Sequence, residues 1–463
     1  MTLAAAAPTP ADIDFDRFAS RLRGRVIRPD ADDYDRARAV HNTAIDRRPL
    51  AIVRVADVAD VARTVDLARA TGLPLAVRSG GHSVAGHGTV DGGLVVDLSL
   101  LRNLRVNPGS GRALIQAGVT AGELTGVLHE HGLAVPLGDT SSVGLGGITL
   151  GGGVGWLVRK HGLTVDSLES AEVVTADGDV VTASAADHPD LFWALRGGGG
   201  NFGVVTRFEF RTHAVGTILG GAIVLPATAA SLAELVRIAS EAPDELTVIA
   251  QVMHAPPAPF IPADQVGRLV IVAMIVYAGD PAEGAGIVAP FRALSRPIAD
   301  TVRPMGYPEI YQLTAPASTP GPLAFRSTYL RAIEPVAEAI LEHLRAATSP
   351  AALAQVRVLG GAASRVAPDA TAYAFRDRPL LLAIIDPYAD PSDGARQDAW
   401  LDEYWGAIRA HGAGVMASFL GDEGEARVRE AYPGATYERL AAIKRRYDPD
   451  NLFRLNQNIP PAR

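Results

Sequence analysis

The stretch that decides the fold covers residues 78–88 and reads RSGGHSVAGHG, directly after the strand-like residues 75–77. Glycine adopts positive φ without strain, so a glycine-rich turn can aim successive backbone N–H groups into one concavity and bind a pyrophosphate. A histidine in the same turn, His82, can bond to the ring of a redox cofactor. By itself the stretch is equally compatible with a structural histidine in a glycine-rich turn. The rest of the chain separates these two interpretations.

Three further stretches follow in order: residues 137–156 (LGDTSSVGLGGITLGGGVGW), 197–205 (GGGGNFGVV) and 447–459 (YDPDNLFRLNQNI). The second contains the G-x-G-x-x-G pattern of nicotinamide-binding Rossmann units, which follow a strand and open a helix. Here a helix-like segment precedes the glycines and a strand-like segment follows them. The reversed order argues against a nicotinamide site and favours a loop that contacts another cofactor.

The four stretches, in this order and at this spacing, resemble the covalent FAD enzymes of the vanillyl-alcohol oxidase superfamily, in particular its berberine-bridge-enzyme-like branch. The resemblance implies an α+β fold of that type with two domains. Residues 1–215 and 447–463 are expected to form the FAD-binding domain, and residues 216–446 a substrate domain built on an antiparallel sheet. His82 matches the histidine that the family joins to the 8α carbon of the flavin.

The same resemblance assigns further residues to FAD. They are Arg78, Ser79, Gly80, Gly81, Ser83, Gly86, His87, Asp139, Thr140, Val143, Gly144, Gly146, Gly147, Gly151, Gly155, Asn201, Gly203, Val204, Asn456 and Asn458. The two tail asparagines offer neutral amide donors near flavin N1 and C2=O, where negative charge develops on reduction.

The chain has no cysteine. Disulfides, thiolate nucleophiles and cysteine-ligated metal sites are therefore excluded, and no metal site is expected. Many relatives in the resembled family attach the flavin a second time through a cysteine, and the matching position here is Thr140. We therefore expect covalent attachment through His82 only.

Family members that oxidise alcohols or sugars place two tyrosines at the flavin, and their matching positions here are Val154 and Phe419. Neither side chain accepts a proton, which favours an amine substrate, because an amine can yield hydride without deprotonation of a hydroxyl. Tyr373 and Tyr432 are the catalytic candidates that remain, although either is also compatible with simple packing.

Val143 matches the family position beside the oxygen-reactive carbon of the flavin, where valine leaves room for dioxygen and a bulkier side chain obstructs it. This favours an oxidase that passes electrons to dioxygen and releases hydrogen peroxide. Three alternatives stay open: an FAD-dependent dehydrogenase or oxygenase of a polyketide-like or sugar substrate, a flavin-binding protein without catalysis, and a nicotinamide-dependent Rossmann enzyme, which the reversed order around residues 198–203 disfavours.

The net charge is −8 and there is no long cluster of Lys and Arg, which argues against nucleic acid or anionic lipid as a partner and favours a small-molecule substrate. The longest apolar run, residues 269–278, is half the length of a membrane-spanning helix. Residues 1–10 lack the basic region of a signal peptide, so a frayed terminus and a cytoplasmic location are expected.

Local patterns predict several elements. Apolar spacing predicts a helix over residues 58–71 that ends at Gly72, and Thr120 with Glu123 predicts a capping box. Ser231 is expected to open a further helix. Strands over residues 269–278, 355–359 and 380–385, with a helix over 397–410, suggest an antiparallel sheet with helices on one face.

Overall fold

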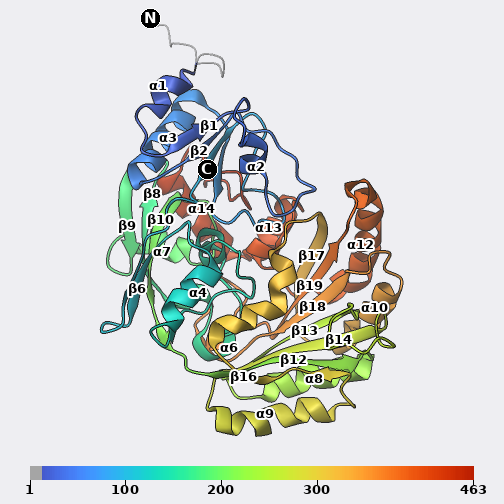
Figure 1. Cartoon of the computed structure of the whole chain (residues 1–463). Helices are drawn as coiled ribbons and strands as arrows, with labels where there is room; N and C mark the ends of the chain where they lie inside the picture. The colour runs from blue at the N-terminus through green and yellow to red at the C-terminus, as the bar shows by residue number, and fades with distance from the viewer. Residues whose placement is uncertain (1–12) are drawn as a thin grey trace, which may run out of the picture.

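The computed structural model describes residues 13–463. The expectation for residues 1–10 lies outside this part of the chain. Figure 1 shows one lobe that combines two small sheets with the C-terminal end of the chain, and a second lobe built on a large sheet with helices on its outer side. This arrangement confirms the predicted α+β fold class.

The first sheet carries the strand that ends at the glycine turn. Its spatial order is β1 (Arg25–Ile27), β2 (Ala51–Arg54), β4 (Leu94–Asp97) and β3 (Leu75–Arg78), with β2 and β3 parallel to β4. Helix α3 (Val58–Thr71) links β2 to β3, begins at the N-cap Asp57 and ends at Gly72, whose φ of 68° closes the helix. The sequence prediction for this helix is confirmed. The turn at residues 78–88 therefore leaves the carboxyl edge of a parallel sheet, where α/β sheets commonly bind ligands.

The second sheet is antiparallel and contains, in spatial order, β5 (Leu104–Asn107), β6 (Arg112–Gln116), β10 (Val204–Arg211), β8 (Leu168–Val174) and β9 (Val180–Ser184). Helix α7 (Pro189–Leu195) precedes the third glycine loop and β10 follows it, which confirms the order that argued against a Rossmann unit. Helix α4 (Ala121–His129) has the predicted capping box between Thr120 and Glu123.

The third sheet has eight strands. They are, in spatial order, β15 (Ala299–Asp300), β12 (Ile218–Pro226), β14 (Leu269–Tyr277), β13 (Leu246–His254), β18 (Leu353–Val358), β19 (Leu380–Pro387) and β17 (Leu323–Leu330), with β16 (Arg303–Met305) paired to β12. All of these pairings are antiparallel. One face packs on helices α8 (Ala229–Glu241), α10 (Glu334–Arg345) and α12 (Gly394–Ile408), as predicted. The opposite face is directed to the first lobe.

Two predicted limits are corrected. Helix α8 begins three residues after Pro226 and not at Ser231, because the extended Thr228 is the N-cap and its hydroxyl accepts a hydrogen bond from the Ser231 amide at 3.0 Å. Helix α12 begins at Gly394, before the predicted residue 397. At α8 both Thr228 and Ser231 are suitable N-caps and the sequence does not say which one serves, whereas α12 begins without a side-chain cap that could mark its start.

The remaining α-helices are between 4 and 13 residues long. They are α1 (Phe15–Ala19), α2 (Tyr34–Arg38), α5 (Leu145–Leu150), α6 (Val158–His161), α9 (Pro281–Ala293), α11 (Ala362–Arg365), α13 (Glu425–Ala431) and α14 (Ala435–Tyr447), and a small pair of strands joins β7 (Leu133–Ala134) to β11 (His213–Ala214).

The chain returns to the first lobe near its end, and Figure 1 shows the C terminus among elements of the first hundred residues. Val428 of α13 and Leu440 of α14 are buried in the same core as the first two sheets. The predicted domain limits assign both helices to the substrate domain. Those limits stay a prediction, and this packing favours a return to the FAD-binding domain earlier than residue 447.

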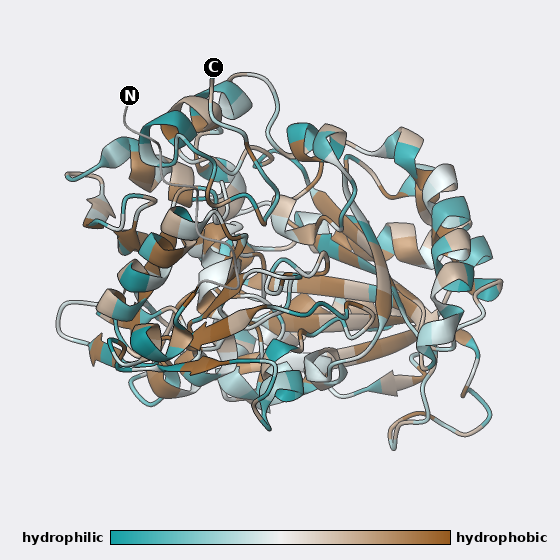
Figure 2. Cartoon of the chain, turned by 90° about the horizontal axis from the view of Figure 1, so that it is seen from above, coloured by the Kyte–Doolittle hydropathy of each residue, from teal (hydrophilic) through white to brown (hydrophobic). Residues whose placement is uncertain are grey.

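Hydropathy follows this layering: Figure 2 shows strands largely in brown and outward-facing helical turns in teal. Within residues 13–463, no helix is both long and apolar enough to cross a membrane. The same described residues contain no cluster of three or more His, Cys, Asp or Glu side chains suited to a metal ion.

Candidate functional site

Two glycine loops close on each other at the edge of the first sheet. A Cβ atom built on Gly80 would lie 2.3 Å from the backbone nitrogen of Gly144, and one built on Gly144 would lie 2.2 Å from that of Gly80. No side chain fits at either position. The hydroxyl of Ser79 donates to the carbonyl of Ala117 at 2.6 Å and accepts from the amide of Gly146 at 3.2 Å. The turn of residues 78–88 and the loop before α5 therefore form one unit.

His82 lies at the junction of these loops. Its Nε2 atom is 2.9 Å from the hydroxyl oxygen of Ser142, and its ring stacks on that of His41 at a centroid distance of 3.9 Å. Burial, with a smaller contribution from the nearby His41, lowers the pKa of His82 to about 3. The imidazole is therefore neutral near pH 7, and a neutral ring nitrogen is the form that can attack an electrophilic carbon.

A buried ion pair supports the turn of residues 78–88. Arg78 donates through Nη2 to Asp97 at 3.1 Å, and Arg54 donates to the same carboxylate at 2.9 Å. Burial raises the pKa of Asp97, but the charge of Arg78 and the hydrogen bond from Arg54 outweigh burial and hold this pKa below its usual value. The Arg78 side chain thus supports the loop, and its direct contact with FAD stays a prediction.

Asn201 fastens the tail of the chain to the third glycine loop. Its Oδ1 accepts from the amide of Ile459 at 3.0 Å, and its Nδ2 donates to the carbonyl of Gln457 at 3.2 Å. The buried ammonium of Lys444 donates to the carbonyls of Asn201 and Phe453 at 2.7 and 2.9 Å. Lys444 was missed in the sequence, because it stands in a charged run that is typical of a solvated helix end.

The residues present fit a large dinucleotide cofactor. Three side chains that the sequence assigned to FAD have buried polar atoms without a hydrogen-bond partner among the described residues: Nε2 of His87 and Oδ1 of Asn456 and Asn458. Buried polar atoms are normally satisfied, so these atoms await a ligand or water. They lie on the turn of residues 78–88 and on the tail.

Other assigned glycines have close protein neighbours of their own. A Cβ atom would meet Ile45 at Gly86, Ser418 at Gly151, the Leu137 carbonyl at Gly155 and Val174 at Gly203. Protein packing alone explains why these positions are glycine. Contact with FAD stays a prediction for them and for the remaining assigned residues, which are Gly81, Ser83, Thr140, Val143, Gly147 and Val204.

A tyrosine pair lies where the sequence predicted the substrate. The hydroxyls of Tyr329 on β17 and Tyr373 are hydrogen-bonded, and both rings are buried in one cluster with Val154, against which Phe419 packs. Burial raises the pKa of Tyr373 to about 12 and raises that of Tyr329 well above its usual value. Both hydroxyls are therefore protonated at neutral pH. The pair stands beside the two positions at which the resembled family places its own tyrosines.

Tyr432 has a different environment. Its hydroxyl donates to the carbonyl of Gly197 at 3.1 Å, and its ring belongs to the core of the first lobe. This bond holds the third glycine loop against α13. The geometry favours a packing role for Tyr432, whereas Tyr373 stays the catalytic candidate.

Arg357 on β18 is a site residue that the sequence analysis missed. It is 5% exposed, and its Nη2 atom donates to Oδ2 of Asp139 at 2.7 Å. Its guanidinium lies over the ring of Phe419, 4.8 Å from the centroid. The carboxylate of Asp139, which the sequence assigned to FAD, is thus bound to the substrate-domain sheet, and its backbone carbonyl accepts from Thr314.

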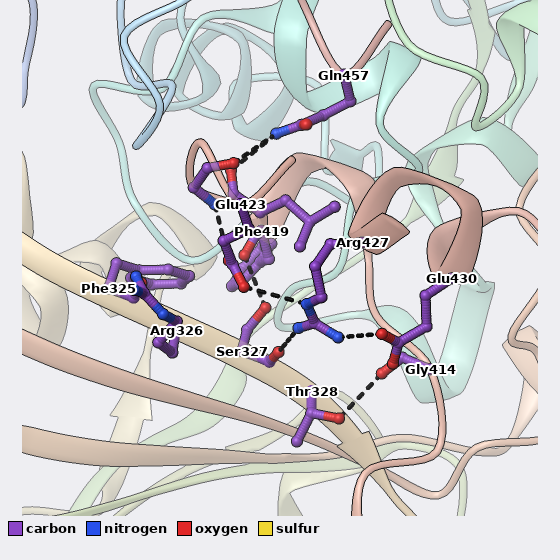
Figure 3. Close-up of polar contacts among 12 residues, drawn as sticks. Phe325, Arg326, Ser327, Thr328, Gly414, Phe419, Glu423, Arg427, Glu430 and Gln457 are labelled. Carbon is purple, nitrogen blue, oxygen red and sulfur yellow. Dashed lines mark hydrogen bonds and ion pairs between the residues drawn. The ribbon is translucent and has the colours of Figure 1, made fainter. Parts of the chain in front are cut away.

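A polar network fixes Phe419, as Figure 3 shows. Ser327 on β17 donates to the carbonyl of Phe419 at 2.7 Å, and Arg427 of α13 donates to the carbonyl of Ser327 at 3.0 Å. Gln457 of the tail donates to the carbonyls of Leu420 and Gly421 at 3.0 and 3.1 Å. One wall of the candidate substrate site is therefore tied to the same tail that carries Asn456.

Two family models match the chain. One, described as an FAD binding domain, matches residues 49–184, and the other, described as berberine and berberine like, matches residues 420–460. The first range contains His82 and the loop of Val143. The second contains Asn456 and Asn458.

Full-length relatives agree with these matches. (R)-6-hydroxynicotine oxidase of Paenarthrobacter nicotinovorans is 32% identical over 95% of this chain and 97% of its own length. Xylooligosaccharide oxidase of Thermothelomyces thermophilus is 31% identical over 91% of this chain and 89% of its own. The crystal structure of 6-hydroxy-D-nicotine oxidase from Arthrobacter nicotinovorans gives a TM-score of 0.85 at 29% identity, over 95% of this chain and 98% of that one. The similarity thus includes both lobes.

Proposed function

Because this chain belongs to the berberine-bridge-like family of FAD-linked oxidoreductases, and is therefore an FAD-dependent enzyme, we propose that it is an oxidase with FAD attached through His82 alone. The proposed reaction removes a hydride from a small organic amine, or from an alcohol of the secondary-metabolite type. Dioxygen takes up the two electrons and two protons and leaves as hydrogen peroxide.

One observation carries this proposal: neutral His82 is held by Ser142 where the two glycine loops meet. The bond between Nε2 and the Ser142 hydroxyl fixes the orientation of the ring. Nδ1 makes no hydrogen bond to the described residues and is therefore the nitrogen proposed to carry the flavin. Bound there, FAD supplies the acceptor for the hydride and the centre that reacts with dioxygen. With no cysteine in the chain, a second thioether link cannot form.

The substrate side supports an amine or an easily oxidised alcohol. Val154 and Phe419 cannot take a proton, and the tyrosine hydroxyls beside them are protonated at neutral pH. Tyr373, whose hydroxyl keeps its own proton and is hydrogen-bonded to Tyr329, is proposed to orient the substrate nitrogen or oxygen by a hydrogen bond. A neutral amine needs no stronger base, because its lone pair assists loss of the hydride. The name of one relative gives hydroxynicotine, a small heterocyclic amine, as substrate.

Val143 supports dioxygen as the acceptor. It follows Ser142 and precedes Gly144 in the chain, its carbonyl accepts from the amide of Ala121, and the residue is half-buried. A valine at this point leaves more space than leucine or isoleucine. We propose that this space admits dioxygen to the flavin.

The test uses the flavin-containing protein under anaerobic conditions. A library of small amines and alcohols is added while flavin absorbance is followed, and dioxygen is then admitted and peroxide measured. The proposal expects at least one amine or alcohol to bleach the flavin, with equimolar peroxide on reoxidation. Bleaching without peroxide would indicate a dehydrogenase, and a flavin that no compound bleaches would indicate a non-catalytic flavin-binding protein.

A further inference from the structure

We propose that Arg357 binds the substrate, and that the substrate carries a carboxylate that docks on its guanidinium. The inference rests on the proposed function, because it places this carboxylate in the same substrate site. It narrows the substrate from a small amine or alcohol to one that bears an acidic group.

The donors of Arg357 are only partly used. Arginine has five N–H donors in a rigid planar arrangement, one on Nε and two on each terminal nitrogen. Nη2 donates to Asp139, whereas Nε and Nη1 are buried and have no acceptor among the described residues. The Arg357 side chain, which is 5% exposed, thus has three N–H donors on Nε and Nη1 without an acceptor. A buried donor without an acceptor is costly, and more so when it is charged.

The guanidinium of Arg357 lies beside residues of the candidate substrate site. On β18 the side chains of Ala354, Val356 and Val358 pack on the helices, so Gln355 and Arg357 face the first lobe. Arg357 is level with Leu381 on β19, and Leu381 is level with Tyr329 on β17. The guanidinium therefore lies in the same row of the sheet as the tyrosine pair, and over the ring of Phe419.

The neighbouring groups favour an anion over other ligands. Among the described residues of β13, β17, β18 and β19 that face the first lobe, Arg357 is the only one with a charged side chain. Asp139 approaches from the opposite lobe and anchors one end of the guanidinium, which fixes its plane. A carboxylate matches the remaining planar donors and makes stronger hydrogen bonds to them than a neutral carbonyl does.

Gln355 provides a second polar group for the proposed ligand. Its Oε1 atom is buried without a donor among the described residues, two positions from Arg357 on the same face of β18. The two side chains start roughly 7 Å apart along the strand, since each residue advances about 3.3 Å. A molecule with a carboxylate and a nearby N–H or O–H group would satisfy both. The amine or alcohol that the proposed oxidation acts on carries an N–H or O–H group of this kind.

The test compares matched acids and amides as ligands of the flavin-containing protein: benzoate with benzamide, phenylacetate with phenylacetamide, and cyclohexanecarboxylate with its amide. Binding is followed by the change in flavin absorbance. We expect at least one acid to bind about ten-fold or more tightly than its amide, as charge-assisted hydrogen bonds imply. The variant R357Q, and the double variant R357Q/D139N that leaves no unpaired buried carboxylate, should lose this preference.

The control is R326Q. Arg326 lies on β17 but pairs with Asp402 of α12 on the opposite face, so its loss should leave the preference for acids unchanged. Equal binding of every acid and its amide to the wild type would overturn the inference, as would an intact preference in the double variant. A changed flavin potential in that variant with unchanged ligand preference would assign Arg357 to the flavin instead.

The two proposals fail in different ways. Bound flavin and its reduction by dithionite are measured first on the same wild-type sample. Protein without bound, reducible flavin would contradict the proposed function, whereas reducible flavin without any preference for acids would contradict only the role of Arg357.

Discussion

The imidazole of His82 lies 2.9 Å through Nε2 from the hydroxyl of Ser142, and this contact joins the loop that is proposed to carry the flavin to the loop that contains Val143. Sixty residues separate the two side chains in sequence. The contact sets the orientation of the ring and leaves its other nitrogen available. Attachment of the flavin and access of dioxygen are thus proposed to depend on neighbouring residues of one loop.

Removal of this contact should slow covalent attachment. S142A takes away a hydrogen bond worth about 1 kcal/mol, so attachment of FAD to the flavin-free protein should be roughly five- to ten-fold slower. The measurement is the fraction of protein-bound flavin after acid precipitation at successive times. S141A is the control, because Ser141 contacts Ser318 and not the histidine. Equal rates in both variants would contradict the positioning role.

The rate of covalent attachment should not depend on protonation of His82 between pH 5 and 9. Because the pKa of His82 is about 3, its ring stays neutral over this whole range.

Tyr373 should act on substrate oxidation. Y373F removes a hydroxyl that is hydrogen-bonded to Tyr329 and proposed to orient the substrate, so it should slow anaerobic flavin reduction by about 10-fold, the effect of one hydrogen bond of about 1.4 kcal/mol. Y432F is the matched control, because the Tyr432 hydroxyl donates only to the carbonyl of Gly197. It should cost about 1 kcal/mol of stability and leave the reduction rate nearly unchanged. The measurement is stopped-flow absorbance with any compound that bleaches the flavin. Equal rates in the two variants would assign Tyr373 to packing.

Val143 should control the reaction with dioxygen. V143L or V143I adds bulk beside the proposed oxygen-reactive centre, so reoxidation of the reduced flavin should slow strongly while anaerobic reduction by substrate stays nearly unaltered. Stopped-flow absorbance of each half-reaction separates the two effects. Equal slowing of both would indicate overpacking of the loop. An unchanged rate of flavin reoxidation would remove the support that Val143 gives to the proposed oxidase activity.

Lys444 should hold the tail in place. It is fully buried, pairs with Asp448 at 2.6 Å and donates to two carbonyls. K444M leaves the carboxylate of Asp448 buried without its cation and should lower the free energy of unfolding by about 3–5 kcal/mol. Flavin retention should fall with it, because the tail carries Asn456 and Asn458. R445M, at the exposed neighbouring residue, is the control for denaturant unfolding and flavin content. A K444M variant with the stability and flavin content of R445M would contradict this role.

Local chemistry made part of the fold predictable. Helix α3 could be read from its apolar spacing and from Gly72, and α4 from the pair Thr120 and Glu123, because caps and periodicity act over a few residues. The order of α7 and β10 followed in the same way. The resemblance of the four loops to a family gave the fold class and the importance of His82.

Contacts between distant segments could not be predicted. Asp139 and Arg357 are 218 residues apart, and their pairing depends on how the large sheet meets the first lobe. Arg357 itself stands in an alternating strand, where a single cation usually faces solvent. Tyr373 was a candidate from the sequence, but its pairing with Tyr329 could not be predicted for a related reason: the two side chains meet only through the register of β17 and a loop between β18 and β19.

The central claim is that FAD is attached to the protein through His82 alone, and mass spectrometry after acid precipitation tests it most directly. The pellet of the wild-type protein should remain yellow, and the peptide that contains His82 should carry the added mass of FAD on its imidazole. The variant H82A should bind FAD through the glycine loops but release all of it into the acid supernatant. A colourless wild-type pellet, or flavin mass on a peptide that lacks His82, would contradict the account.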